Sequence, residues 1–482
     1  MLAQVDPNDP LTAKPAALPD GAAFQSGPDP RIHKVVISAD CKMIAAASGS
    51  GSVAIFDAAT GTLNKTIAAV EGGECFAVDF TTDGKSIVTG GSDQTLRLWD
   101  IASGKEVRKF NGDDGQIKAL GCAPDGERVA SADTAGTLRI WDLKTGDTLH
   151  AITGHGDNLP AGMDTPIIDA LAWAPDGRVV VTEANDETAR IWDVIGAKQL
   201  HVLPLHDGSV AAVAISPNNT VGVSTRGAKT SGTSHLRVWE VATGQIRRVI
   251  NGHTEDISCV GFAPDGRTVF SGANDLTVRQ WDVESGVEIR RFRLSGVPAS
   301  LACSSNGAFL VVSTPREGVV EFSLRQGPPA TKNDVCKDAE DAWARLNSMD
   351  YDARAAGFNF FLKALPPTQA VAELTRRGPR ARTSDDIQKL RDLIARLDAE
   401  TYAARATAFS ELRAIGGAAR SELSEAAGSH PSPEVRARAS ELLSEIGGPY
   451  SPREVLIAEI LRTLDTPDAR AALVAMPAAG AR

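Results

Sequence analysis

The stretch Leu96-Arg97-Leu98-Trp99-Asp100 contains the clearest copy of a phrase that recurs along this chain. Each copy is a short apolar run that ends in an aromatic residue and an acid, and successive copies lie 42 to 51 residues apart. A period in the forties with a terminal Trp-Asp predicts one four-stranded propeller blade per repeat, because such a sheet buries both faces only when neighbours stack around an axis. The copies are Leu98-Trp99-Asp100, Ile140-Trp141-Asp142, Ile191-Trp192-Asp193, Val238-Trp239-Glu240 and Gln280-Trp281-Asp282, with Ile55-Phe56-Asp57 and Phe322-Ser323-Leu324 as weaker end copies.

A second series of residues, independent of the tryptophans, keeps the same period. Asp-Gly between two apolar runs is typical of a tight hairpin, because Gly accepts the positive φ that such turns need. Agreement between the two series makes a chance repeat an unlikely explanation. The turn sites are Asp40-Cys41, Asp83-Gly84, Asp125-Gly126, Asp176-Gly177, Asn218-Asn219, Asp265-Gly266 and Asn306-Gly307.

The chain resembles the WD-repeat (WD40-type) family over residues 18–325, and the resemblance implies an all-β seven-bladed propeller. In that family an Asp in the turn before the third strand orients a loop His, which engages a Ser or Thr and the Trp indole. The other blades depart from this pattern; blade three, for example, has Ala135 where the Asp is expected. The full pattern is matched by His155, Thr182, Asp186 and Trp192 in blade four and by His253, Ser271, Asp275 and Trp281 in blade six.

These Ser/His/Asp sets contain the residue types of a nucleophilic triad. A nucleophile needs an exposed position and an oxyanion hole, whereas Ser271 falls inside a predicted strand. We therefore predict a structural polar network and no catalytic residues. No CxxC motif or His/Cys ligand spacing is present, so we expect no metal and no cofactor, and the six cysteines are predicted to be reduced core residues.

The outermost strand of blade seven is missing from its expected place, because Pro328-Pro329 follows the last repeat and cannot form a central strand. The segment at 22–26 precedes the first inner strand. We expect it to complete blade seven, so that the two ends of the repeat region overlap and close the ring.

Two connections are longer than the repeat requires, at 156–166 in blade four and at 226–234 in blade five. The loop that enters an innermost strand and the loop between the second and third strands emerge on the same face of an up-and-down blade. Insertions on one face of a repeat fold often mark the binding face, although drift in tolerant loops is the simpler alternative. The candidate partner-binding residues are Asp157, Asn158, Met163, Asp164, Arg226 and Lys229.

Beyond residue 337 the apolar pattern becomes helical. Ile387, Leu390, Ile394 and Leu397 lie on one helical face, and the segment 405–417 is repeated at 436–448, an offset of 31 residues. This part resembles HEAT-like α-solenoid repeats of the phycobilisome-lyase type over residues 386–476. Earlier helices are expected in 338–377.

Composition excludes several functional classes. A net charge of −11 argues against general affinity for nucleic acid or anionic lipid, and the basic cluster at 376–382 lacks interleaved aromatics. No apolar run is long enough to cross a membrane, and no secretory signal is visible near the start. We expect a cytoplasmic protein, and the excess of Arg over Lys suggests a bacterial one.

The predicted domains are a flexible segment (1–17), the propeller (18–325), a linker (326–337) and a helical HEAT-like domain (338–482). Both folded parts are partner-binding architectures, so we predict a non-enzymatic scaffold or adaptor for protein–protein interactions. The alternatives are an enzyme or small-ligand-binding propeller that uses its central channel or inserted loops, or the interaction part of a signalling system. Fold alone does not decide among them.

Overall fold

The structure is a computed structural model of the 482-residue chain. It describes residues 22–25, 31–112, 114–156, 159, 164–203, 210–226, 234–324, 336, 338–346, 351–377, 384–399, 401–415, 419–445, 452–464 and 466–475. By their internal contacts, the residues form two compact units. One comprises Met1–Gln280 and Arg291–Arg325, and the other comprises Trp281–Arg290 and Gln326–Arg482.

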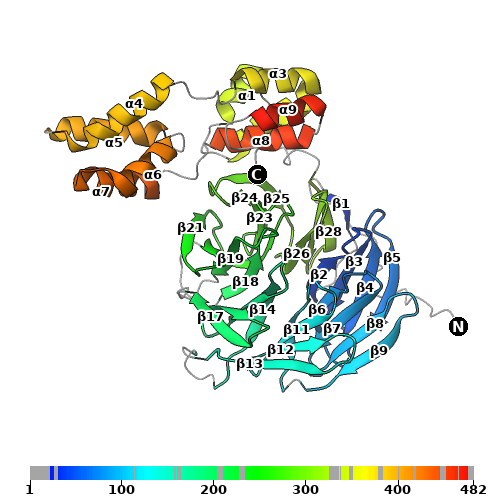
Figure 1. The fold of residues 1–482 in the computed structure, drawn as a ribbon. Coiled ribbons are helices and arrows are strands. Elements are labelled where there is room, and N and C mark those ends of the chain that lie inside the picture. The colour runs from blue at the N-terminus through cyan, green and yellow to red at the C-terminus, as the bar shows by residue number, and fades with distance from the viewer. Residues whose placement is uncertain are drawn as a thin grey trace. The chain divides into compact units, whose positions relative to one another are not determined.

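Seven four-stranded antiparallel sheets form a β-propeller, as predicted, and their innermost strands surround the centre of the ring (Figure 1). Blades one to three consist of β2 (Ile32–Ile37), β3 (Met43–Ser48), β4 (Ser52–Asp57) and β5 (Leu63–Ala68); β6 (Cys75–Phe80), β7 (Ser86–Gly91), β8 (Leu96–Asp100) and β9 (Lys105–Phe110); and β10 (Ile117–Cys122), β11 (Arg128–Asp133), β12 (Thr137–Asp142) and β13 (Thr148–Thr153). Blades four to six consist of β14 (Ile168–Trp173), β15 (Val179–Ala184), β16 (Ala189–Asp193) and β17 (Lys198–Leu203); β18 (Val210–Ile215), β19 (Val221–Arg226), β20 (His235–Glu240) and β21 (Ile246–Asn251); and β22 (Ile257–Phe262), β23 (Thr268–Ala273), β24 (Thr277–Asp282) and β25 (Glu288–Arg293). Blade seven consists of β26 (Ser300–Cys303), β27 (Phe309–Thr314), β28 (Gly318–Ser323) and β1 (Ala22–Gln25).

The ring closes through the N-terminal strand, as the sequence predicts. Strand β1 pairs antiparallel with β28, with Ala22 opposite Phe322 and Gln25 opposite Val320. It therefore supplies the outermost strand that the Pro-Pro segment cannot form. The closing strand covers an edge that would otherwise present unpaired backbone groups.

The predicted hairpin turns between the first and second strands are also confirmed. In every blade the second residue of the predicted turn pair has a positive φ. Glycine takes this position in five blades, and Cys41 (φ 58°) and Asn219 (φ 57°) take it in the other two. The five glycines are Gly84, Gly126, Gly177, Gly266 and Gly307.

The propeller core lies between neighbouring blades. Trp192 of blade four packs with Ala130 and Ile140 of blade three, and Trp239 of blade five packs with Val181 and Ile191 of blade four. Each of these residues is nearly or fully buried. The repeated Trp therefore fills the gap between sheets, which explains its strict spacing. Of the inner-strand cysteines, Cys75 and Cys259 are buried, and Cys122 and Cys303 are half-buried.

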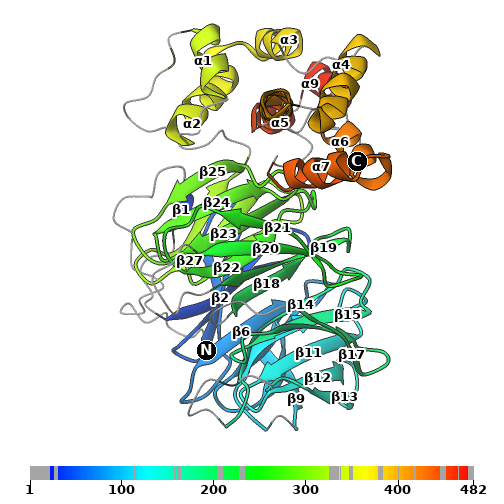
Figure 2. The same cartoon turned by 90° about the vertical axis from the view of Figure 1, so that its left-hand side faces the viewer.

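The C-terminal region is helical, as predicted, and its described helices contain two apolar cores (Figures 1 and 2). The first core joins α1 (Ala339–Arg345), α2 (Tyr351–Asn359), the π-helical turn η2 (Phe360–Ala364), α3 (Pro367–Arg377), α8 (Pro452–Leu464) and α9 (Pro467–Ala475). The second joins α4 (Ser384–Ala395), the 3-10 turn η3 (Arg396–Asp398), α5 (Tyr402–Ile415), α6 (Arg420–Ser429) and α7 (Pro433–Glu445).

The sequence predicts one series of repeats over residues 386–476, but the helices of this range belong to two different apolar cores. Helices α4 to α7 contain both copies of the repeated sequence and share a core that includes Leu390, Leu412 and Leu442. Helices α8 and α9 pack instead with α1 to α3, around Phe358 and Phe361. None of the helices that the structure describes combines the length and the apolar character needed to cross a membrane.

Candidate functional site

Four predicted residues of blade four form a continuous hydrogen-bonded chain. His155 precedes β14, Thr182 lies on β15, Asp186 lies in the turn after β15, and Trp192 lies on β16. His155 Nε2 is 2.8 Å from Thr182 Oγ1, and the Trp192 indole donates to the same oxygen at 2.6 Å. His155 Nδ1 is 3.1 Å from each carboxylate oxygen of Asp186.

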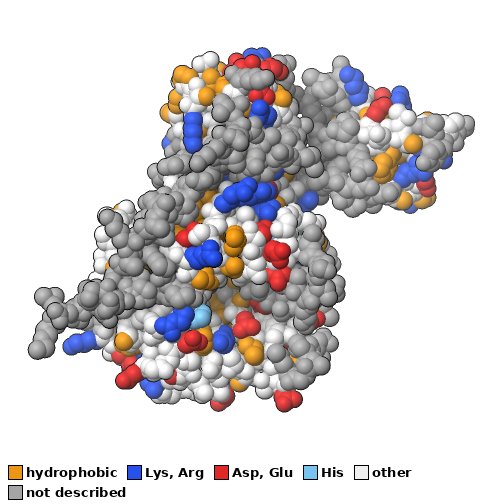
Figure 3. Space-filling view, turned by 180° about the vertical axis from the view of Figure 1, so that it is seen from behind, with side chains coloured by type: hydrophobic (Ala, Val, Ile, Leu, Met, Phe, Trp, Pro, Cys, Tyr) orange, Lys and Arg blue, Asp and Glu red, His pale blue; other side chains and the backbone are white. Residues whose placement is uncertain are grey.

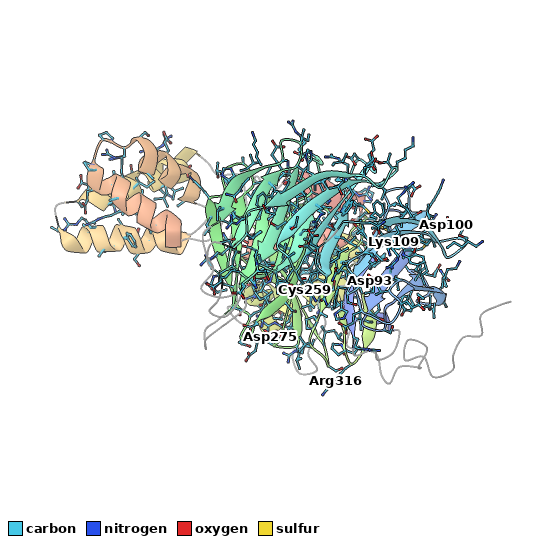
Figure 4. The ribbon with its side chains drawn as sticks, turned by 90° about the horizontal axis from the view of Figure 1, so that it is seen from below. Asp93, Asp100, Lys109, Cys259, Asp275 and Arg316 are labelled. Atoms are coloured by element: carbon cyan, nitrogen blue, oxygen red, sulfur yellow. The ribbon has the colours of Figure 1, made fainter. Side chains whose placement is uncertain are left out.

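Blade six repeats this hydrogen-bond geometry with His253, Ser271 and Asp275. His253 Nδ1 is 2.9 Å from Asp275 Oδ2, and its Nε2 is 2.7 Å from Ser271 Oγ. The backbone N–H and the hydroxyl of Thr277 both donate to Asp275 Oδ1. Trp281, the fourth predicted member, is 2% exposed on β24. Figure 4 shows Asp275 with Arg316, which lies in the corresponding turn of blade seven, toward the same side of the ring.

One arrangement of protons satisfies every member of the blade-four chain. The Trp192 N–H donates to Thr182, the Thr182 hydroxyl donates to His155 Nε2, and the His155 Nδ1–H donates to Asp186. Thr182 and Ser271 are both fully buried. A substrate could not reach either hydroxyl, so the geometry favours a structural network over a nucleophilic triad.

Hydrogen bonds hold the two network carboxylates in their charged form. Burial acts to raise the pKa of Asp186, but the hydrogen bonds from the His155 ring, the backbone N–H of Gly156 and the Thr188 hydroxyl have the larger effect and lower it. The result is a pKa well below the usual value. Asp275 behaves in the same way beside His253, with added help from Thr277 and Arg279. Each Asp therefore stabilises its blade as an anion.

An arginine two residues before the Trp is a further member that the sequence reasoning missed. In blades two, three, four and six its guanidinium pairs with an acid in or beside the turn between the second and third strands, and the arginine side chain is mostly shielded from solvent. The signal was present, because the same spacing recurs in every Trp-containing blade. The pairs are Arg97–Asp93 at 2.6 Å, Arg139–Asp133 at 2.8 Å, Arg190–Asp186 at 3.3 Å and Arg279–Asp275 at 2.9 Å.

Blade three replaces the expected turn Asp with an acid two residues earlier. Asp133, the last residue of β11, accepts the backbone N–H groups of Ala135 (3.0 Å) and Thr137 (2.9 Å). It is fully buried and pairs with Arg139. The absence of Asp at position 135 is thus compensated by a residue on the strand, which the family pattern does not indicate.

The candidate partner-binding residues lie largely outside the described residues. Asp157, Asn158, Met163 and Lys229 belong to that group. Asp164 is exposed in the connection before β14, and the backbone of Arg226 ends β19.

Strand register relates the two long connections to each other. In blade four Ile168, the first residue of β14, pairs with Ala184, the last residue of β15. In blade five Val210, the first residue of β18, pairs with Arg226, the last residue of β19. The connection before an inner strand and the connection after a second strand therefore leave from the same edge of a blade. Blades four and five are neighbours through β14 and β18.

The lengths of these connections depart from those of the other blades. The connection from β13 to β14 spans 154–167, whereas the corresponding connection from β9 to β10 spans 111–116. The connection from β19 to β20 spans 227–234, whereas that from β7 to β8 spans 92–95.

Comparison with known proteins identifies the repeats. Residues 61–100, 104–142, 146–193 and 244–282 match the family described as WD domain, G-beta repeat. Each segment contains the outer strand of one blade and the first three strands of the next, and the segments end at the Trp-Asp pairs of blades two, three, four and six.

Several curated proteins are similar to this chain over part of its length. Protein groucho of Drosophila melanogaster is 29% identical over 147 residues, which is 30% of this chain and 20% of that protein. Nuclear distribution protein PAC1 of Arthroderma benhamiae is 31% identical over 127 residues, 25% of this chain and 28% of its own. Autophagy-related protein 16 of Arabidopsis thaliana is 27% identical over 240 residues, 49% of this chain and 43% of its own. The chain thus spans less than half the length of these eukaryotic relatives, and its own residues form a seven-bladed β-propeller, four segments of which match the WD domain, G-beta repeat family, followed by a helical region.

Proposed function

We propose that this protein is a non-enzymatic scaffold or adaptor that binds protein partners through one face of the propeller. The observation that supports this role is the pair of long connections, 154–167 and 227–234, which leave corresponding edges of two neighbouring blades. In blades four and six the Ser or Thr, His and Asp side chains of the polar network are buried. Their burial is consistent with a binding role for the protein and not a catalytic one. Similarity to groucho, PAC1 and autophagy-related protein 16 is confined to parts of those proteins.

The surface chemistry favours a protein partner over a polyanion. The chain has a net charge of −11, and the face in Figure 3 mixes acidic, basic and apolar side chains. A mixed surface of this kind suits specific recognition of another protein better than binding to a phosphate backbone. Asp164 is an exposed member of the proposed binding face.

The helices α4 to α7 provide a proposed second surface. They contain two copies of one sequence pattern around a common core, which supports a HEAT-like arrangement of helix pairs. Bacterial origin remains a prediction from composition.

Loop replacement tests the propeller face. In one variant 156–166 is replaced by the shorter segment 114–115 from blade three, which leaves His155 in place, and in another 227–234 is replaced by 92–95 from blade two. Surface loops tolerate changes in length, so both variants should fold, and each should lose partners that the intact chain captures from its native cell. Direct binding of each purified partner then measures the loss.

The control replaces the turn 102–104, between β8 and β9, with 144–146 from blade three; this turn leaves the opposite edge of its blade. Circular dichroism checks the fold of all three variants. If both loop variants retain every partner, the propeller face is not the binding surface, and α4 to α7 become the region to test.

A further inference from the structure

A cavity of about 150 Å³ occupies the centre of the ring and is lined by the innermost strands of all seven blades. Its volume is on the scale of a cavity that holds a benzene-sized molecule. Its polar and charged lining residues are His33, Lys34, Lys118, Asp169, Ser258 and Ser300.

Lys34 is a long charged residue at an inner-strand position that holds a small residue in blades two to four and in blade six. Six inner strands have a register shift after their first residue, and in β2 the pairing resumes at Lys34, two residues beyond that first residue. The same position holds Ala77, Ala119 and Ala170 in blades two to four, and Cys259 in blade six. Small residues therefore satisfy the fold at this position, and packing does not require a lysine there.

The Lys34 ammonium makes no hydrogen bond or ion pair within 4 Å to any residue that the structure describes. Its side chain reaches channel solvent, but protein surrounds it, and this desolvation lowers its pKa. The charge of Asp79 opposes this lowering of the Lys34 pKa. Asp79 is already engaged, because its carboxylate accepts the N–H groups of Phe80 and Cys122, each at 2.9 Å.

Positive charge exceeds negative charge on the cavity wall. Lys118 lies 3.5 Å from the ring centroid of Phe76, a cation–π contact that holds its ammonium at the wall. Asp169 is the one carboxylate in the lining, against the ammonium groups of Lys34 and Lys118. Burial raises the pKa of Asp169, and the positive charge of Lys118 opposes this shift.

The hydroxyl groups of Ser258 and Ser300 line the cavity, and they differ in whether they can donate a hydrogen bond to a ligand. The Ser258 hydroxyl donates to the carbonyl of Pro298. Ser300 Oγ accepts the N–H of Val35 at 3.2 Å, and its own proton has no acceptor among the described residues. Ser300 can therefore donate a hydrogen bond into the cavity.

We propose that the central cavity binds a small oxyanion, a carboxylate or phosphate group, with Lys34 as the main ligand and with Lys118 and Ser300 as further contacts. An oxyanion would supply the acceptors that the Lys34 ammonium lacks, and its negative charge would offset the positive excess of the wall. The size of the cavity limits the ligand to a small molecule. This inference goes beyond partner binding and does not depend on it.

The probes are sodium phosphate and sodium acetate, titrated into the full chain by calorimetry at an ionic strength held constant with sodium chloride. We expect saturable binding of one or both anions. Lys34→Met should weaken binding roughly tenfold or more, because a charge-assisted hydrogen bond is lost. Lys118→Met should have a smaller effect. Lys42→Met is the matched control, because this lysine of the same blade has a side chain that is 78% exposed.

Binding of phosphate alone would identify a phosphate-bearing ligand, and binding of acetate alone a carboxylate. Absence of saturable binding by either anion, or equal binding by Lys34→Met, would overturn the proposal and leave Lys34 hydrated by channel water. Should Lys34→Met fail to fold, NMR of ¹³C-labelled lysine in the wild-type chain replaces it. The ε-CH₂ signal of Lys34, assigned through Lys34→Arg, must then move during the titration while that of Lys42 stays fixed.

Discussion

Glu183 lies fully buried in blade four, and neither oxygen of its carboxylate has a hydrogen-bond partner in the described chain. Burial, then the charges of Asp169 and Asp186, raise its pKa well above the usual value. An unfolded Glu releases its proton near about pH 4.3. The folded chain holds that proton to a higher pH, so the folded state loses stability as pH rises through this window. Glu183→Gln should therefore stabilise the protein more at about pH 8 than at about pH 5, as measured by chemical denaturation. Glu127→Gln, at an exposed position, is the control, and a parallel pH dependence for Glu183→Gln and wild type would contradict the prediction.

At the scale of the element, blade six depends on a polar network that joins its second strand, its turn and the loop that enters it. His253→Ala would remove the hydrogen bonds that the imidazole makes with the buried Ser271 hydroxyl and with the Asp275 carboxylate, and should lower the free energy of unfolding by about 1–3 kcal/mol. The midpoint of chemical denaturation, followed by Trp fluorescence, measures the loss. His201→Ala serves as the control, because this histidine has one exposed hydrogen bond, to the carbonyl of Ala242 on the outer side of the propeller. An unchanged midpoint in a folded His253→Ala protein would show that the network does not stabilise the blade.

At the scale of the whole molecule, propeller closure depends on one short strand from the other end of the repeat region. Deletion of residues 1–27 removes β1 and leaves the edge of β28 unpaired. Exposed edges promote aggregation, so the truncated protein should melt at a lower temperature and lose solubility. Deletion of residues 1–17 keeps β1 and is the control. Differential scanning calorimetry and light scattering compare the two proteins, and a monomeric 1–27 deletion with native thermal stability would mean that β1 does not close the ring.

Much of the propeller could be predicted because it depends on local features of the sequence. Strand pairing in each blade depends on apolar runs separated by short turns, and the turn residues need a positive φ that Gly84 and its equivalents supply. The Pro-Pro segment excludes a strand by removing backbone donors. These constraints act over a few residues, so the blades, their turns and the need for an outer strand from elsewhere could be predicted.

What only the tertiary structure decided depends on residues that are distant in sequence. Asp133 takes over the turn hydrogen bonds of blade three, a substitution that a fixed motif spacing cannot anticipate. Helices α8 and α9 share a core with α1 to α3, because an amphipathic helix specifies an apolar face but not which partner covers it. Nothing in the sequence distinguishes Lys34 from other lysines, and only ring closure places it in the lining of the central cavity. Periodicity determined the blades because it is local, whereas the environment of a side chain arises only when seven blades meet.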